Sequence, residues 1–209
     1  MRHRLKAAFL FTLDRVIPTV FVFFLCIALV ACSFASFASA AESDIPVVIQ
    51  MISNITNIVA PGVSAILATA GATAVATLVV LCGSPAPGAT QCDPTSMVGQ
   101  YQAATGAAKT TLLQKIQAAL TAANNSITAM LNIAKGLPTS VAAAIVTAIG
   151  VALQTVTLLI SLVPVAVSTS LGAMSSVQRN ALKAIPHPKV LKAQFNAAIG
   201  SQYPAAVLQ

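Results

Sequence analysis

The sequence predicts an all-α protein, a compact bundle of four or five hydrophobic helices that follows an N-terminal signal or anchor segment. Three observations support this prediction. Hydrophobic residues make up 57% of the chain, apolar positions recur at helical spacings of three and four, and two long stretches carry no charge. These stretches run from Ile45 to Cys92 and from Gly136 to Gln178. Since about a quarter of an average soluble domain is charged, they indicate contact with lipid, with another apolar surface or with a tightly packed core.

The N-terminal segment, residues 1–40, has the features of a signal peptide. Basic residues come first, and an apolar run from Val16 to Val30 follows. Ala38-Ser39-Ala40 then supplies small residues of the kind that signal peptidases recognise. We expect the mature chain to begin at Ala41.

Two alternatives for this segment stay open, because it is longer than the usual length of about 15–30 residues. The run from Val16 to Phe37 is long enough for a retained membrane anchor, which needs about 20 apolar residues. Leu29-Val30-Ala31-Cys32 resembles a bacterial lipobox, in which Cys32 would be the acylated first residue.

A first helix is expected after Asp44. Ser43 or Asp44 can accept a capping hydrogen bond, Pro46 suits a first helical turn, and Pro61-Gly62 should end or kink the helix. The stripe that its core side presents consists of Ile45, Val48, Ile52, Ile55 and Val59.

Two more helices are expected before the second uncharged stretch. The run from Val63 to Leu81 is apolar on every face, and helix is favoured there although Thr and Val have some strand preference. Residues 96–135 give the clearest amphipathic pattern, and Lys135-Gly136-Leu137-Pro138 ends it. Core packing is the favoured role of its apolar stripe. Helices that lie in a membrane surface usually carry Lys or Arg along the polar face and Trp or Phe on the other, whereas this one has two internal lysines at most and no aromatic residue from Leu112 to Ala134. The stripe consists of Leu112, Leu113, Ile116, Leu120, Ala123, Ile127, Met130, Leu131 and Ala134.

The last long helix is expected from Val141 to Val163, with Thr139 or Ser140 as its cap and Pro164 as its end or kink. It is apolar all round and would be about 35 Å long, enough to cross a hydrocarbon core of about 30 Å. We take residues 41–185 as one hydrophobic helical domain and residues 186–209 as a basic C-terminal tail.

The cysteines predict one disulfide. Cys26 and Cys32 lie in the leader, which leaves Cys82 and Cys92 in the exported part. An even pair in an exported chain suggests a bridge, and the Gly- and Pro-rich residues between the two cysteines allow the chain to double back.

The residues after the leader offer little catalytic chemistry. Their carboxylates are Glu42, Asp44 and Asp93, and their histidine is His187. Asp93 is expected to form a turn or a cap, and His187, between two prolines, to be structural or to contact a partner. We find no nucleophile motif, phosphate-binding loop or metal-ligand spacing. The sequence therefore predicts a protein that is not an enzyme, with no catalytic, cofactor-binding or metal site and no cofactor.

Two sequence features bear on modification and partners. Asn54 and Asn124 begin Asn-x-Ser/Thr sequences and are glycosylation candidates if the chain enters a eukaryotic secretory lumen. The net charge of +7 and pI of about 9.6 reflect a scarcity of acids and not a dense basic face, so nucleic acid is not an expected partner.

These features predict an exported, non-enzymatic protein, secreted or held in the cell envelope or membrane, that acts through apolar surface. It would be membrane- or interface-active or self-assembling, with membrane lipid, an apolar ligand or further copies of the chain as partners. One alternative is an integral membrane or envelope-complex subunit with two or three spans, and another is a carrier of an apolar ligand. The lack of a Trp/Tyr belt and the split distribution of basic residues count against spans, whereas the uncharged stretches favour them.

Overall fold

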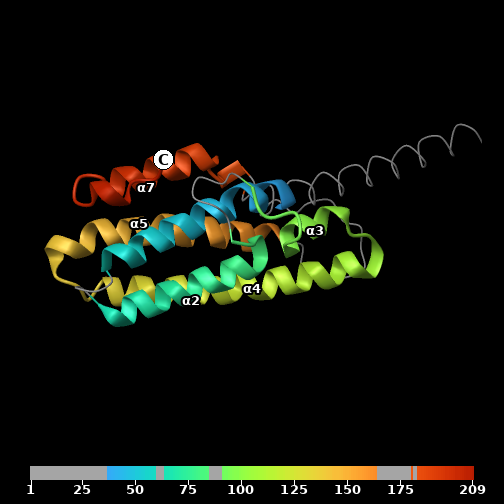
Figure 1. Ribbon diagram of the computed structural model, residues 1–209, viewed down its shortest axis with the longest axis horizontal. Helices are drawn as coiled ribbons and strands as arrows, with labels where there is room; N and C mark the ends of the chain where they lie inside the picture. Colours follow the sequence, from blue (N-terminus) through green and yellow to red (C-terminus); the bar gives the residue numbers. More distant parts are fainter. Residues whose placement is uncertain (1–36, 60–63, 85–90, 164–179, 181–182) are drawn as a thin grey trace, which may run out of the picture.

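A computed structural model describes residues 37–59, 64–84, 91–163, 180 and 183–209 (Figure 1). Within these residues the protein is all-α and has no strand, as the sequence predicts. The predicted anchor and lipobox segments, Pro61-Gly62 and Pro164 lie outside the described residues. After a helix over residues 37–59, the elements are α2 (Ala65–Cys82), α3 (Met97–Ala103), α4 (Gly106–Ala134), α5 (Thr139–Leu162), α7 (Pro188–Ile199) and the 3₁₀ turn η1 (Pro204–Ala206).

The long helices pack side by side along the long axis of the molecule (Figure 1). α4 packs against both α2 and α5, α7 packs against α5, and the short α3 contacts α2 and α4. Each of these helices contributes buried apolar residues to one hydrophobic core cluster, which extends to the C-terminal residues. α4 therefore separates the two most apolar helices, α2 and α5.

The helix over residues 37–59 is buried on most of its circumference. Phe37, Ala38 and Ala41 are all in the core, together with the predicted stripe of this helix. The helix is already formed at residue 37, so the expected start at Ser43 or Asp44 is wrong. The apolar pattern continues through the preceding turn, and burial of that turn outweighs the local capping preference. Pro46 consequently lies inside the helix and leaves one helical hydrogen bond unmade.

The apolar run predicted as helix from Val63 to Leu81 is confirmed as α2, which begins at Ala65. The Ser64 hydroxyl accepts a hydrogen bond from the Leu67 N–H at 3.2 Å and caps its first turn. Gly71 faces the helix over residues 37–59, because a Cβ there would collide with Oγ1 of Thr56. Thr56 is itself fixed by donating to the Ile52 carbonyl at 2.8 Å. Gly71 therefore allows the two helix backbones to approach.

The single helix expected over residues 96–135 is wrong in one respect, since the chain breaks between α3 and α4. Ala104 is extended, with ψ at 149°, and Gly106 has φ at +55°. A left-handed φ favours glycine, so Gly106 allows the chain to turn between the two helices. After the break, most of the predicted stripe of α4 is confirmed as core, whereas Leu112 and Leu131 are half-buried at its margin. The buried members are Leu113, Ile116, Leu120, Ala123, Ile127, Met130 and Ala134.

Prolines lie at the N-terminal ends of α5 and α7. Pro138 precedes α5 without a side-chain cap, so the expected capping by Thr139 or Ser140 is wrong. α7 begins at Pro188, and Nδ1 of His187 accepts a hydrogen bond from the Lys189 N–H at 3.3 Å. The C-terminal residues that the sequence sets apart as a basic tail pack onto the bundle through Leu191, Phe195 and Ile199 of α7.

Candidate functional site

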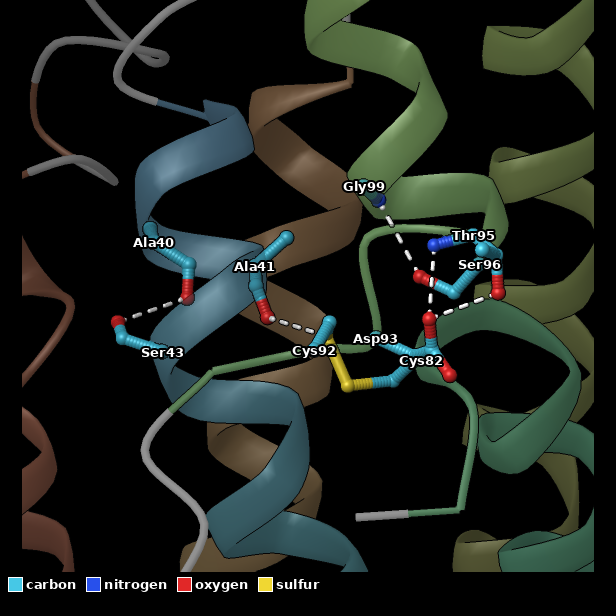
Figure 2. Close-up of a disulfide and its surroundings, with 9 residues drawn as sticks. All are labelled: Ala40, Ala41, Ser43, Cys82, Cys92, Asp93, Thr95, Ser96 and Gly99. Atoms are coloured by element: carbon cyan, nitrogen blue, oxygen red, sulfur yellow. Dashed lines mark hydrogen bonds between the residues drawn. A yellow bond between two sulfur atoms is a disulfide. The ribbon is translucent and has the colours of Figure 1, made fainter.

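A disulfide joins Cys82 and Cys92, with their Cα atoms 4.6 Å apart. It connects the end of α2 to the segment that leads into α3, and the Asp93 N–H donates to the Cys82 carbonyl at 2.8 Å. Figure 2 shows Cys92 facing the carbonyl of Ala41 on the helix over residues 37–59, with Sγ 3.9 Å from that oxygen. The bridge therefore lies where three segments meet. It confirms the predicted pairing and points to an oxidising, extracytoplasmic location.

Asp93 has the turn-forming role expected of it. Its carboxylate accepts hydrogen bonds from the Thr95 N–H at 2.8 Å and from the Thr95 hydroxyl at 2.7 Å (Figure 2). The two hydrogen bonds stabilise the carboxylate and lower the pKa of Asp93. The next residue along, Ser96, accepts from the Gly99 N–H and caps α3.

Two ionisable groups are buried in the bundle. Asp44 is 1% exposed, and desolvation raises the pKa of its carboxyl to about 7 despite a hydrogen bond from the Ser43 hydroxyl. Tyr101 is also 1% exposed, and burial raises its pKa to about 12. Its ring meets Phe37 edge-on with centroids 6.1 Å apart, and Nζ of Lys109 lies 4.9 Å from its centroid. The described residues place no partner at the Tyr101 hydroxyl.

The titratable residues that the sequence singles out have different surroundings. Asp44 is buried in the core, Asp93 accepts hydrogen bonds in a turn, and His187 caps α7. Among the residues that the structure describes, no three His, Cys, Asp or Glu side chains are grouped so that they could hold a metal ion.

The two glycosylation candidates lie within helices. The side-chain amide of Asn54 donates to the Ala206 carbonyl at 2.7 Å, and Oδ1 of Asn124 accepts from the Thr157 hydroxyl at 3.0 Å. In the folded chain Asn54 therefore contacts the C-terminal segment through the same nitrogen that a glycan would occupy, whereas Asn124 contacts α5 through its oxygen.

The outward side of α2 exposes large apolar side chains. Ile66 is 71% exposed and Val80 is 56% exposed. No charged residue occurs anywhere in α2. We call the exposed side of this helix the outer face of α2; it consists of Ala65, Ile66, Thr69, Ala72, Thr73, Ala76 and Val80.

The threonines of α2 do not make this surface a strong hydrogen-bonding one. The hydroxyls of Thr69, Thr73 and Thr77 donate to the carbonyl four residues earlier, at 2.9, 3.0 and 2.8 Å. Each hydroxyl donor is thus satisfied within the helix, and its methyl group adds to the apolar area. A polar-looking sequence of alternating Ala and Thr becomes a surface with little demand for water.

Two described helices are long and apolar enough to cross a membrane, as judged by length and composition: Ala65–Cys82 and Val141–Leu162, with mean hydropathy of 2.2 in each. A core helix of a soluble protein can have the same properties, so the finding is weak evidence by itself. The surface next to these helices is polar, because α4 exposes Gln114, Lys115, Thr121, Asn125 and Asn132.

The fold and its surface define an all-α, hydrophobic helical bundle in which a disulfide joins Cys82 and Cys92. Comparison of the chain with protein families, with curated proteins and with solved structures finds no match in any of the three.

Proposed function

We propose that this protein is an exported, non-enzymatic bundle that attaches to a membrane or another apolar interface through the outer face of α2. The observation that carries the proposal is the mismatch between composition and burial in this helix. Only a third of α2 is buried, yet none of its residues is charged. A helix that is hydrophobic all round is normally enclosed by protein or lipid, so the outer face calls for an apolar partner.

The energetic gain from such a partner is substantial. Fully burying an exposed Ile or Val side chain is worth about 1.5–3 kcal/mol, and Ile66 and Val80 lie at opposite ends of the same face. Because the threonine hydroxyls of α2 already donate to helix carbonyls, removal of water costs less than it would for free hydroxyls. This supports lipid as the partner over a hydrogen-bonding protein surface.

The position of α4 supports attachment in the plane of the interface. α4 packs along α2, and Lys115, Asn125 and Asn132 are exposed on it. If α2 crossed the bilayer within this bundle, these side chains would enter the hydrocarbon, where a central Lys costs about 2.5–3.5 kcal/mol on the most lenient scale. Attachment by the outer face keeps them in water.

The second candidate is an integral membrane subunit, favoured by the length and hydropathy of α2 and α5. It requires both helices to leave α4 and insert separately. Carbonate extraction distinguishes the two functions: an attached bundle is released from membranes, and a spanning subunit stays in the pellet.

Vesicle flotation with two matched lysine substitutions tests the main proposal. Ala76→Lys places a charge on the outer face of α2, whereas Ala122→Lys places one on the exposed side of α4. Both alanines are exposed helical residues, so neither variant should unfold. We expect Ala76→Lys to reduce vesicle binding severalfold and Ala122→Lys to leave it unchanged. Equal binding by the two variants, or no flotation of the unsubstituted protein, would overturn the proposal.

A further inference from the structure

A cleft of about 450 Å³ lies at the end of the helix over residues 37–59, beside the C-terminal segment. One wall is formed by Asn54, Asn57 and Ile58 of that helix. The other is formed by residues 202–206, which follow α7 and include η1. The two walls are about 150 residues apart in the chain.

Side-chain amides hold the second wall in place. The Asn54 amide donates to the Ala206 carbonyl at 2.7 Å. Two residues further on, the side chain of Asn196 in α7 binds the backbone of Leu208. It donates to the Leu208 carbonyl at 2.9 Å and accepts from the Leu208 N–H at 2.8 Å. Ala206 and Leu208 are buried. The segment is therefore anchored on both the helix over residues 37–59 and α7, and the cleft has a defined shape.

The polar groups that the cleft offers to a ligand come from side chains. The N–H groups of Gln202 and Tyr203 donate to the Ile199 carbonyl, and that of Ala206 donates to the Tyr203 carbonyl. By contrast, the amides of Asn57 and Gln202 and the hydroxyl of Tyr203 have no hydrogen bond to another described residue. With Oδ1 of Asn54, whose NH₂ group donates one of its two hydrogens to Ala206, they supply both donors and acceptors.

The lining contains no ionisable group other than the phenol of Tyr203, and Ile58, Pro204 and Ala205 supply apolar surface between the amides. An ionic ligand would lose hydration without gaining an opposite charge. A purely apolar ligand would displace water from the half-buried Asn54 oxygen and Tyr203 hydroxyl without replacing its hydrogen bonds. A ligand with adjacent hydroxyls and a C–H face satisfies both kinds of surface.

We propose that this cleft binds a neutral, hydroxyl-rich ligand of the saccharide class. Carboxamides can donate to one hydroxyl and accept from the next, and the Tyr203 ring and Pro204 can contact the C–H face of a sugar ring. The volume lies within the range of about 300–1,000 Å³ that is typical of small-molecule sites and accommodates a mono- or disaccharide. This site is independent of the outer face of α2, which lies on another helix.

Tyrosine fluorescence of the full chain gives a direct test, because the protein has no Trp and two Tyr residues. In a Tyr101→Phe background, Tyr203 in the cleft is the only source of tyrosine emission. We expect saturable changes with maltose or N-acetylglucosamine in sugar-free buffer, and at least tenfold weaker response to glucuronate at the same concentration. Saturation-transfer NMR on the unsubstituted protein checks that the sugar itself is bound.

Matched amide substitutions localise the site. Asn57→Ala and Gln202→Ala should each weaken sugar binding by about tenfold, the effect of losing about 1.4 kcal/mol. Asn125→Ala, at an exposed asparagine of α4, should have no effect. Absence of saturable binding by either neutral sugar overturns the proposal, and so does binding that survives both cleft substitutions in variants whose circular dichroism spectra are unchanged.

Discussion

The contact between Gly71 and Thr56 makes a quantitative prediction about how closely α2 packs on the helix over residues 37–59. Gly71→Ala adds a methyl group that collides with Oγ1 of Thr56 and lies 3.2 Å from Cε of Met130. Overpacking of this kind costs about 1–3 kcal/mol. The change also gains up to about 1 kcal/mol of helix propensity, so we expect a net loss of about 0–2 kcal/mol.

Gly150 in α5 provides the control, because no side-chain or backbone atom outside its own helix lies within 4 Å of a Cβ added there. Gly150→Ala should therefore gain the propensity without the collision and stabilise the protein by up to about 1 kcal/mol. The two variants should differ by about 1–3 kcal/mol in urea unfolding followed by circular dichroism at 222 nm, with both values taken relative to the unsubstituted chain.

Removal of the colliding atom completes the test. Thr56→Ala in the Gly71→Ala background should recover most of the lost stability, which gives a coupling energy between the two positions. If Gly71→Ala proves as stabilising as Gly150→Ala, or if Thr56→Ala fails to rescue it, then the helices do not approach at Gly71 as described.

Three other predictions concern the core, the buried carboxyl and the disulfide. Leu120→Ala and Ile127→Ala should each cost about 2–5 kcal/mol in unfolding free energy, since both side chains are fully buried; unchanged midpoints would show that this stripe is not core. The raised pKa of Asp44 means that the folded state binds the proton more tightly than the unfolded chain. Stability should therefore fall as the pH rises from about 4 to about 7, by at most about 4 kcal/mol, and a pH profile that Asp44→Asn does not flatten would contradict this. Reduction of Cys82–Cys92 should cost about 2–3 kcal/mol by loop-closure entropy, and equal urea midpoints with and without reductant would argue against it.

Local sequence patterns predicted the helices with regular apolar spacing. The stripe from Leu113 to Ala134 could be predicted because each residue is placed by the 3.6-residue period alone. The disulfide could be predicted because export and an even number of cysteines restrict the pairing. Both features depend on information carried by neighbouring residues.

Features set by distant contacts could not be predicted in the same way. The helix over residues 37–59 begins before Ser43 because Phe37 and Ala41 are buried in the core. The capping pattern does not reveal this burial. The break before Gly106 was missed because a single glycine is also tolerated inside a helix. The cleft joins Asn54 to Gln202, and no local pattern connects residues so far apart.

The burial of Ala41 has a consequence for protein maturation. A cut after Ala40 would create a positively charged α-amino group on a residue that is buried in the core, next to the disulfide at Cys92. The same cut would remove Phe37 and Ala38, which are both buried in the core, and Tyr101 would lose its contact with the Phe37 ring. Loss of a buried Phe side chain costs about 3–5 kcal/mol, and the new ammonium group would be stable only where it reaches water or a partner. Proteolytic maturation at this position would thus remove core contacts at one end of the bundle.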